Sequence, residues 1–322
     1  MNILVTGGAG YIGSTLVPLL LAGGHRVKVL DSLLHGGESL LGVWAHPAFE
    51  FVRGDIRDRA KLAGAVAGME AVVHLAAIVG DPACSHQPDL ARAVNLEGSL
   101  ALIEESQRAG VTRFLFASTC SNYGKMKAAD EYVDEDSELR PVSLYAETKV
   151  TVERALLEAN GMDGWCPTPM RFATVFGVSP RMRFDLTVNE FTLDMLTKKR
   201  LLVFGEQFWR PYVHVRDVAR AIQLVLGSPE SRVKGAVFNV GATGQNLQKQ
   251  QLVEMIRPYA PDAIVEFVHK EEDPRDYRVS FARISDQLDF KVTRTVEEGI
   301  GEVAHLVRSS VIENFADERF RN

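Results

Sequence analysis

Apolar residues along the chain form short continuous runs, and longer stretches with helical spacing separate these runs. In the first 120 residues the runs predict strands at residues 3–5, 27–30, 49–52, 71–75 and 114–117. Continuous apolar strands that alternate with helices indicate a parallel sheet covered on both faces. The pattern therefore predicts an α/β fold, a doubly wound parallel sheet of the Rossmann type.

Helical spacing is clearest at residues 11–22, 94–109 and 144–159. Pro18 lies inside the first of these helices and predicts a kink or a later start. After about residue 171 the alternation loosens, until "HVRDVARAIQLVL" predicts a helix and "GAVFNVG" a strand. We expect a Rossmann domain of residues 1–172, to which about 212–240 return. A smaller C-terminal substrate-binding lobe would comprise about 173–211 and 241–322.

Composition narrows the possible classes of protein. The chain of 322 residues has a net charge of −6, which makes nucleic acid an unexpected partner. The three cysteines are far apart and show no metal-ligand spacing, so we expect no metal and a reducing compartment. The N-terminus lacks a signal-peptide pattern, and no apolar run reaches about 18 residues. We expect a cytoplasmic protein with no membrane contact.

The motif "TGGAGYIG" falls between the first strand and the first helix, where a dinucleotide-binding loop requires glycines. Gly7 permits the tight turn, Gly10 lets the backbone approach a pyrophosphate, and Gly13 lets helix and strand pack closely. Asp31 ends the second strand, and a carboxylate there favours NAD over NADP by bonding the adenosine ribose. The alternatives are a plain tight turn for the glycines and a turn or helix cap for Asp31.

Tyr145 and Lys149 lie four residues apart on the helix predicted at 144–159, so their side chains share a face. A nearby ammonium lowers the pKa of a tyrosine and favours its phenolate, which can then remove a hydroxyl proton. An exposed Tyr–Lys pair on a helix is the alternative interpretation. The pair gains weight because it follows a dinucleotide loop, with "STCSNYG" ending a strand between them.

These motifs resemble those of the extended short-chain dehydrogenases/reductases, and within them the nucleotide-sugar epimerases and dehydratases. The matching segments run in the family's order along almost the whole chain: "TGGAGYIG", Asp31, "GDIRD", "HLAA", Asn95, "STCSNYG", "YAETK", "RFATVFG" and "RPYVHVRDVARA". The resemblance implies that the Rossmann domain holds NAD and that a nucleotide-diphosphate sugar binds under the C-terminal lobe. It also implies a homodimer in which helices 94–109 and 144–159 dock against their copies.

The resemblance further implies roles for individual residues. Thr119 matches the residue that bonds the reacting hydroxyl, Tyr145 the general base, and Lys149 the lysine that holds the nicotinamide ribose. The expected cofactor-binding residues are Gly7, Gly10, Tyr11, Ile12, Asp31, Asp55, Ile56, Leu75, Ala76, Ala77, Asn95, Ser118, Tyr145 and Lys149. For His74 and Asn95 a purely structural role stays open, and Cys120 is interpreted as a small apolar filler.

On the substrate side, a diphosphate calls for arginine, whose planar fork matches phosphate oxygens. The expected substrate-binding residues are Thr119, Thr174, Asn189, Arg210 and Arg275. Arg181 and Arg183 could contribute, although any of these arginines could instead be a surface residue. Residues 79–89 could form part of the sugar pocket, and the acidic stretch 129–141 is interpreted as a solvated loop.

Two departures from the family pattern bear on the reaction. The 4,6-dehydratases place an Asp-Glu pair after the catalytic threonine, whereas Cys120 and Ser121 follow Thr119 here. Many 4-epimerases carry Asn where this chain has Thr174. We expect an NAD-dependent nucleotide-sugar 4-epimerase that acts through a 4-keto intermediate. The alternatives are a 4-ketoreductase or 4-dehydrogenase, less readily a 4,6-dehydratase, and remotely a non-catalytic dinucleotide-binding scaffold.

Overall fold

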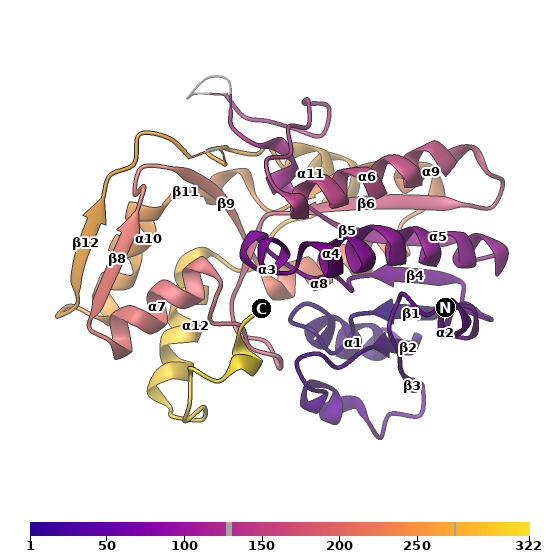
Figure 1. The fold of residues 1–322 in the computed structure, drawn as a ribbon, viewed down its shortest axis with the longest axis horizontal. Coiled ribbons are helices and arrows are strands. Elements are labelled where there is room, and N and C mark those ends of the chain that lie inside the picture. Colours follow the sequence, from indigo (N-terminus) through magenta and orange to yellow (C-terminus); the bar gives the residue numbers. More distant parts are fainter. Residues whose placement is uncertain (127–130, 274) are drawn as a thin grey trace.

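The structure is a computed structural model that describes residues 1–126, 131–273 and 275–322. Within these residues, seven parallel strands form one sheet in the larger part of the molecule (Figure 1). In sheet order they are β10 (Phe238–Val240), β6 (Cys166–Phe172), β5 (Arg113–Thr119), β4 (Ala71–His74), β1 (Asn2–Thr6), β2 (Arg26–Asp31) and β3 (Phe49–Arg53). The order reverses at β1, which lies between β4 and β2, as in a Rossmann sheet. The predicted fold class is confirmed.

All five strands predicted in the first 120 residues are present, with ends that differ by one or two residues. The largest difference is at β5, which continues two residues beyond the predicted end and pairs with β6 as far as Thr119. This extension places Thr119 at the carboxyl edge of the sheet, where ligands bind in open α/β folds.

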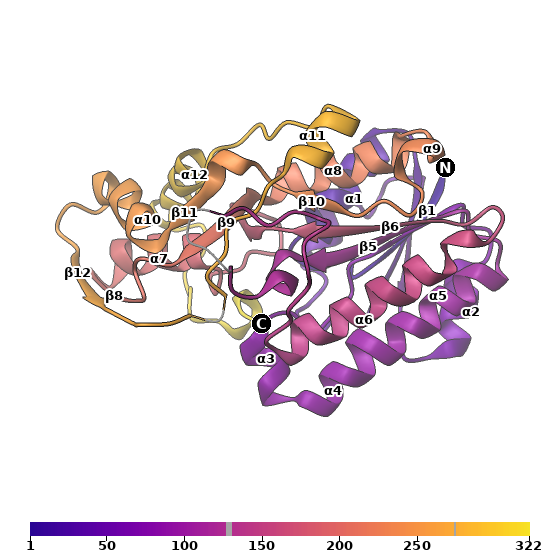
Figure 2. The ribbon, with the colours of Figure 1, turned by 90° about the horizontal axis from the view of Figure 1, so that it is seen from above.

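Helices cover both faces of the sheet (Figure 2). On one face lie α1 (Gly13–Ala22), α8 (Val215–Gly227) and α11 (Ala282–Leu288), and on the other α2 (Arg59–Val66), α5 (Ser99–Arg108) and α6 (Leu144–Glu158). Leu16 and Ile222 belong to the core on the first face, whereas Leu102 and Leu156 belong to the core on the second. Two apolar cores therefore sandwich the sheet and fix its carboxyl edge.

Two predicted helices begin elsewhere in the structure. Helix α1 begins at Gly13 rather than residue 11 and runs through Pro18, whose missing amide removes one internal hydrogen bond. The helix predicted at 94–109 is the end of a longer helical stretch. This stretch consists of α4 (Pro88–Arg92), a π-helical turn (Ala93–Gly98) and α5. Helix α6 begins at Leu144 as predicted.

The smaller part of the molecule is built on a separate apolar cluster. Helices α7 (Thr187–Thr197), α10 (Lys249–Ile256) and α12 (Val296–Arg308) enclose it together with the parallel pair β8 (Arg200–Phe204) and β12 (Ile264–Val268). Val188, Leu252 and Ile300 are fully buried members of this cluster. These elements lie beyond the carboxyl edge of the main sheet (Figure 1).

A small sheet of β7 (Thr174–Phe176), β9 (Trp209–His214) and β11 (Asn246–Gln248) joins the two parts. The chain after β9 returns to the main sheet through α8 and β10, and α8 packs on α1. The predicted domain boundary at residue 212 falls inside β9. The division into domains stays a prediction.

The remaining elements are short. They are α3 (Asp81–His86), α9 (Glu230–Val233) and the 3-10 turns Glu38–Val43, Cys120–Tyr123, Ala159–Gly161, Thr243–Gln245, Arg257–Tyr259 and Glu318–Phe320. Among the described residues, no helix is long and apolar enough to cross a membrane.

Candidate active site

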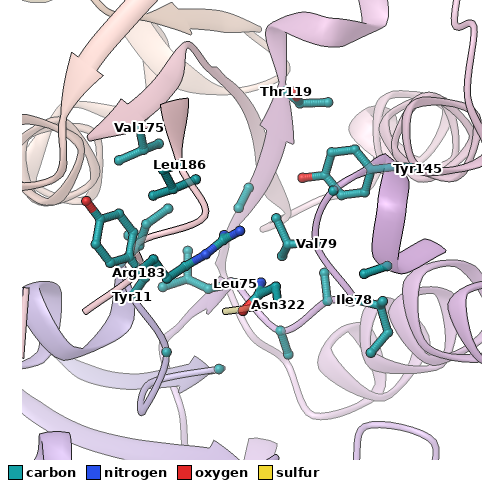
Figure 3. A pocket seen from close by; sticks show the side chains of 18 of the residues that line it. Tyr11, Leu75, Ile78, Val79, Thr119, Tyr145, Val175, Arg183, Leu186 and Asn322 are labelled. Atoms are coloured by element: carbon teal, nitrogen blue, oxygen red, sulfur yellow. The ribbon is translucent and has the colours of Figure 1, made fainter. Parts of the chain in front are cut away.

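A cavity of about 830 Å³ lies at the carboxyl edge of the main sheet, facing the smaller part of the molecule (Figure 3). Most of the residues singled out from the sequence line it, from the glycine loop to Arg275. Two of them, Asn95 and Asn189, do not line it. The cavity thus brings together the expected cofactor side and the expected substrate side.

The glycine loop leaves room for a ligand where side chains would fill it. Gly7 has a φ of +75°, and a Cβ there would lie 2.7 Å from the backbone nitrogen of Ala76. At Gly10, which lines the cavity, a Cβ would lie 3.2 Å from the carbonyl oxygen of Gly7. The amides of Tyr11 and Ile12 donate to no acceptor among the described residues. Free amides at the start of α1 form an anion-binding cradle, which fits a dinucleotide's diphosphate.

Asp31 lies at the end of β2 and lines the same cavity. Its carboxylate accepts hydrogen bonds from the amides of Ala9 (2.9 Å) and Leu33 (2.8 Å). Burial raises the pKa of Asp31, and these two backbone donors oppose that shift. The carboxylate is thereby held rigidly beside the glycine loop, where the ribose of a bound dinucleotide is expected.

Tyr145 and Lys149 project from the first turns of α6, which Ser143 caps by accepting from the amide of Ala146. Lys149 is buried, and its Nζ donates to the carbonyl of Ala117 at 2.8 Å. The same Nζ lies 5.8 Å from the centre of the Tyr145 ring. The two side chains therefore share one face of the helix, as their spacing predicts.

Burial has the largest effect on the pKa values of Tyr145 and Lys149. Burial raises the pKa of Tyr145 above its usual value of 10, and nearby Arg183 opposes this shift only in part. Burial also lowers the pKa of Lys149 to about 8. Burial is the largest influence on the pKa of Tyr145, and the expected effect of Lys149 in favour of the phenolate stays a prediction.

Thr119 and Tyr145 approach the cavity from neighbouring elements, and the tyrosine hydroxyl points into it (Figure 3). The Oγ1 of Thr119 lies 2.6 Å from the Oγ of Ser121 and accepts from the amide of Ser121 at 3.2 Å. Ser121 also lines the cavity, whereas Cys120 is buried and its thiol donates to the carbonyl of Arg171. Cys120 therefore fills the protein interior, as expected.

A buried ion pair supports these elements from behind. Glu153 of α6 and Arg171 of β6 meet at 2.8 Å, and their side chains are 2% and 5% exposed. The carboxylate of Glu153 also accepts from the hydroxyl of Ser118 and from Nδ2 of Asn122. Because Ser118 precedes Thr119 and Glu153 lies one turn after Lys149, the pair ties the end of β5 to α6.

Asn95 and Asn189 hydrogen-bond to the backbone, and their expected contacts with ligands stay predictions. Asn95 accepts from the amide of Ile78 and donates to its carbonyl, at 2.7 and 2.9 Å. Asn189 accepts from the amide of Gly177 and donates to the carbonyl of Arg183. Both side chains are nearly fully buried, and each holds a loop that lines the cavity.

His74 is also structural. Its two ring nitrogens are bonded to the hydroxyls of Thr6 (2.7 Å) and Ser99 (2.8 Å). Burial lowers the pKa of this histidine to about 3, so the ring is neutral.

The two arginines expected to bind the substrate line the cavity, and each is paired with a carboxylate. Arg210 meets Asp273 at 2.6 Å, and Arg275 meets Asp81 at 2.7 Å. Asp81 also accepts from the hydroxyl of Ser143, the cap of α6. The predicted segment 79–89 thus reaches the cavity through its first residues.

Sequence reasoning included Asp81 only as a member of the segment 79–89 and missed Lys249 entirely. The position of Asp81 after the strand end that carries "HLAA" is the signal that could have singled it out. Lys249 begins α10 and belongs to no motif, so only the fold brings it to the cavity.

The acidic stretch is exposed over most of its described part, and residues 129 and 130 lie outside the described residues. Glu135 differs from the rest of this stretch, which was expected to be solvated. It is buried and accepts a hydrogen bond from the amide of Asn239 at 2.7 Å. It also lies 3.6 Å from Arg283. Its carboxylate therefore fastens the loop to β10.

The known proteins that this chain resembles include nucleotide-sugar enzymes. The chain is 29% identical to the UDP-glucose 4-epimerase of Corynebacterium glutamicum over 272 residues, 80% of each chain. The UDP-glucose 4-epimerase of Thermotoga maritima, solved with UDP-glucose, matches with a TM-score of 0.84 and 29% identity over 96% of this chain and 99% of that one. The dTDP-glucose 4,6-dehydratase DesIV of Streptomyces venezuelae, solved with NAD, matches with a TM-score of 0.85 and 28% identity over 96% and 98%.

The relatives thus include epimerases and dehydratases, and their coverage extends over both parts of the molecule. The model of the NAD dependent epimerase/dehydratase family matches residues 3–241. This chain therefore belongs to the NAD-dependent epimerase/dehydratase family, and its cofactor is NAD.

Proposed function

We propose that the protein is an NAD-dependent nucleotide-sugar 4-epimerase. One observation carries the proposal: a single cavity is lined by Thr119 and Tyr145, by the glycine loop, and by Arg210 and Arg275. A sugar nucleotide whose diphosphate is bound by these arginines would extend its sugar towards the two hydroxyls. Relatives solved with UDP-glucose and with NAD support this arrangement.

In the proposed reaction, Oη of Tyr145 takes the proton of the sugar 4-hydroxyl, and Oγ1 of Thr119 hydrogen-bonds the same oxygen. The chemistry that NAD supplies when bound is reversible oxidation at sugar carbon 4, and its nicotinamide ring adds a positive charge to the cavity. Added positive charge favours the phenolate, against the burial that raises the pKa of Tyr145. The 4-keto sugar then turns so that the opposite face of carbon 4 points towards the cofactor, and Tyr145 returns the proton to the oxygen on carbon 4.

The residues after Thr119 favour epimerisation over dehydration. Removal of water from a sugar needs an acid and a base in addition to the tyrosine. Cys120 is buried behind the strand, and Ser121 offers a hydroxyl already bonded to Thr119. Neither side chain has the carboxyl group that the dehydratase pattern places there.

A 4-ketoreductase or 4-dehydrogenase would use the same Tyr145 and Thr119, and the difference lies in whether the sugar turns over. Incubation of the purified protein with UDP- and dTDP-sugars separates these reactions. A new 4-epimer without net NADH absorbance at 340 nm is the expected result. Stoichiometric NADH, or a 4-keto-6-deoxy product, would contradict the proposal.

Variants test the role of the tyrosine. Tyr145→Phe should lower turnover by about 10²–10⁴, the range for a positioned acid–base group, and leave NAD affinity unchanged. Tyr132→Phe is the matched control, because Tyr132 is exposed and does not line the cavity. If Tyr145→Phe kept most of the activity, the catalytic base would lie elsewhere.

A further inference from the structure

The chain that follows β7 is fastened directly to the glycine loop. The hydroxyl of Tyr11 donates to the carbonyl of Gly177 at 2.6 Å, and the hydroxyl of Ser179 donates to the carbonyl of Tyr11 at 2.6 Å. The hydroxyls of Ser14 and Ser179 lie 3.0 Å apart, and the amide of Arg181 donates to Oγ of Ser14 at 3.2 Å. The backbone of Arg181 is therefore held at the N-terminus of α1.

The side chain of Arg181 is buried and only 6% exposed, yet it lines the cavity. Its Nη2 donates to the carbonyl of Arg321 and to Oδ1 of Asn322. Its Nε is buried and has no hydrogen-bond partner among the described residues. A buried N–H without an acceptor is costly, so a ligand that supplies one gains affinity there.

Arg181 also forms no ion pair with a carboxylate in the described part of the chain, unlike Arg210 and Arg275 of the same cavity. Arg183, two residues later, is held by both oxygens of Asp185 at 2.9 and 2.6 Å. Burial and the charge of Arg183 lower the pKa of Arg181 to about 10. Its positive charge is thus poorly compensated, which favours an anionic ligand.

We propose that Arg181 binds the diphosphate of NAD, although it comes from the part of the chain expected to bind substrate. The free amides of Tyr11 and Ile12 lie on the same loop that holds the Arg181 backbone, and Asp31 lies close enough for its charge to act on Arg181. A diphosphate bound to those amides would also accept a charge-assisted hydrogen bond from the unpartnered Nε–H of Arg181. Arg210 and Arg275, which also line the cavity, would then bind the sugar nucleotide.

This arrangement means that NAD is held by both parts of the molecule. Release of the cofactor would then require separation of the glycine loop from the chain after β7, which the four hydrogen bonds resist. Such retention suits an enzyme that returns its cofactor to the starting state in each turnover. The inference concerns binding of NAD and holds whichever sugar reaction the protein performs.

Calorimetric titrations with NAD, adenosine and UDP test the proposal on the full chain. Arg181→Gln should weaken NAD binding by about 10–100-fold, because a charge-assisted hydrogen bond to the diphosphate is lost. Adenosine, which has no phosphate, and UDP, as a probe of the substrate end, should bind within about twofold of the unmutated protein. Arg200→Gln is the matched control, since Arg200 is exposed on β8 and does not line the cavity.

Arg181→Lys provides a second variant that keeps the charge and changes the geometry. It should weaken NAD binding less than Arg181→Gln does and leave adenosine binding unchanged. If the glutamine variant does not fold, the lysine variant alone tests the proposal. Unchanged NAD affinity in either variant would overturn the proposal. So would a loss confined to UDP, which would assign Arg181 to the substrate, or an equal loss for adenosine and NAD, which would indicate general damage to the loop.

Discussion

Replacement of Arg171 by methionine should destabilise the protein strongly. Arg171 and Glu153 are almost completely buried, and Nε and Nη2 of the arginine both donate to the carboxylate. With methionine at this position, Glu153 would keep the neutral donors Ser118 and Asn122 but lose its counter-charge. Removing one partner of a buried pair costs about 3–5 kcal/mol, a fifth or more of the roughly 5–15 kcal/mol that stabilises a typical domain.

The free energy of unfolding from urea titration is the assay. The control is Arg200→Met, which breaks the Arg200–Glu266 pair, whose side chains are 67% and 48% exposed. That variant should lose less than about 1 kcal/mol, because water screens the pair. The double variant Arg171→Met with Glu153→Met should lose less than the sum of the single variants by about 2–3 kcal/mol, since it leaves no buried charge unpaired. A cost at Arg171 no larger than at Arg200, or strict additivity, would refute the reasoning.

Three further predictions follow from the site. Asp31→Ala should reduce the difference in binding free energy between NAD and NADP by about 1–3 kcal/mol. Equal affinity of the unmutated protein for the two cofactors would contradict the role of Asp31. Because burial lowers the pKa of Lys149 to about 8, the folded state binds fewer protons than the unfolded chain between pH 8 and the ordinary lysine pKa of about 10.4. The unfolding free energy should therefore rise across that range relative to Lys149→Met, by up to about 3 kcal/mol, and parallel pH curves would contradict it. Sedimentation should give a homodimer in which α5 and α6 dock against their copies, and a 35.5 kDa monomer at micromolar concentration would contradict the predicted assembly.

The central strands β1, β4 and β5 were predictable because most of their residues are buried and their sequences contain continuous apolar runs. Helix α6 was predictable for a similar local reason, since Ser143 caps its start. The start of α1 was not, because "YIG" is apolar enough for a helix while the loop geometry holds those residues outside it. The small sheets also escaped prediction, since strands of three residues such as β7 have no periodicity of their own.

The site shows the same division between local and long-range information. Gly7, Tyr145 and Lys149 were found because their chemistry depends on fixed spacing along one loop or one helix turn. The sequence does not show which polar residues bond to distant parts of the chain and which are free to contact a ligand. The side-chain amide of Asn95 bonds to the backbone of Ile78. The pKa of Tyr145 is raised by burial, which residue spacing in the sequence does not reveal.

The most direct test of the proposed reaction follows one deuterium atom. A nucleotide sugar that the protein turns over is prepared with deuterium at sugar carbon 4, and the products are separated and analysed by mass spectrometry and NMR. A 4-epimerase that returns the same hydrogen to the opposite face should give the 4-epimer with deuterium still at carbon 4 and no NADH absorbance at 340 nm. A product without deuterium at carbon 4 that accumulates together with NADH, or deuterium found at carbon 6 of a dehydrated sugar, would contradict the account.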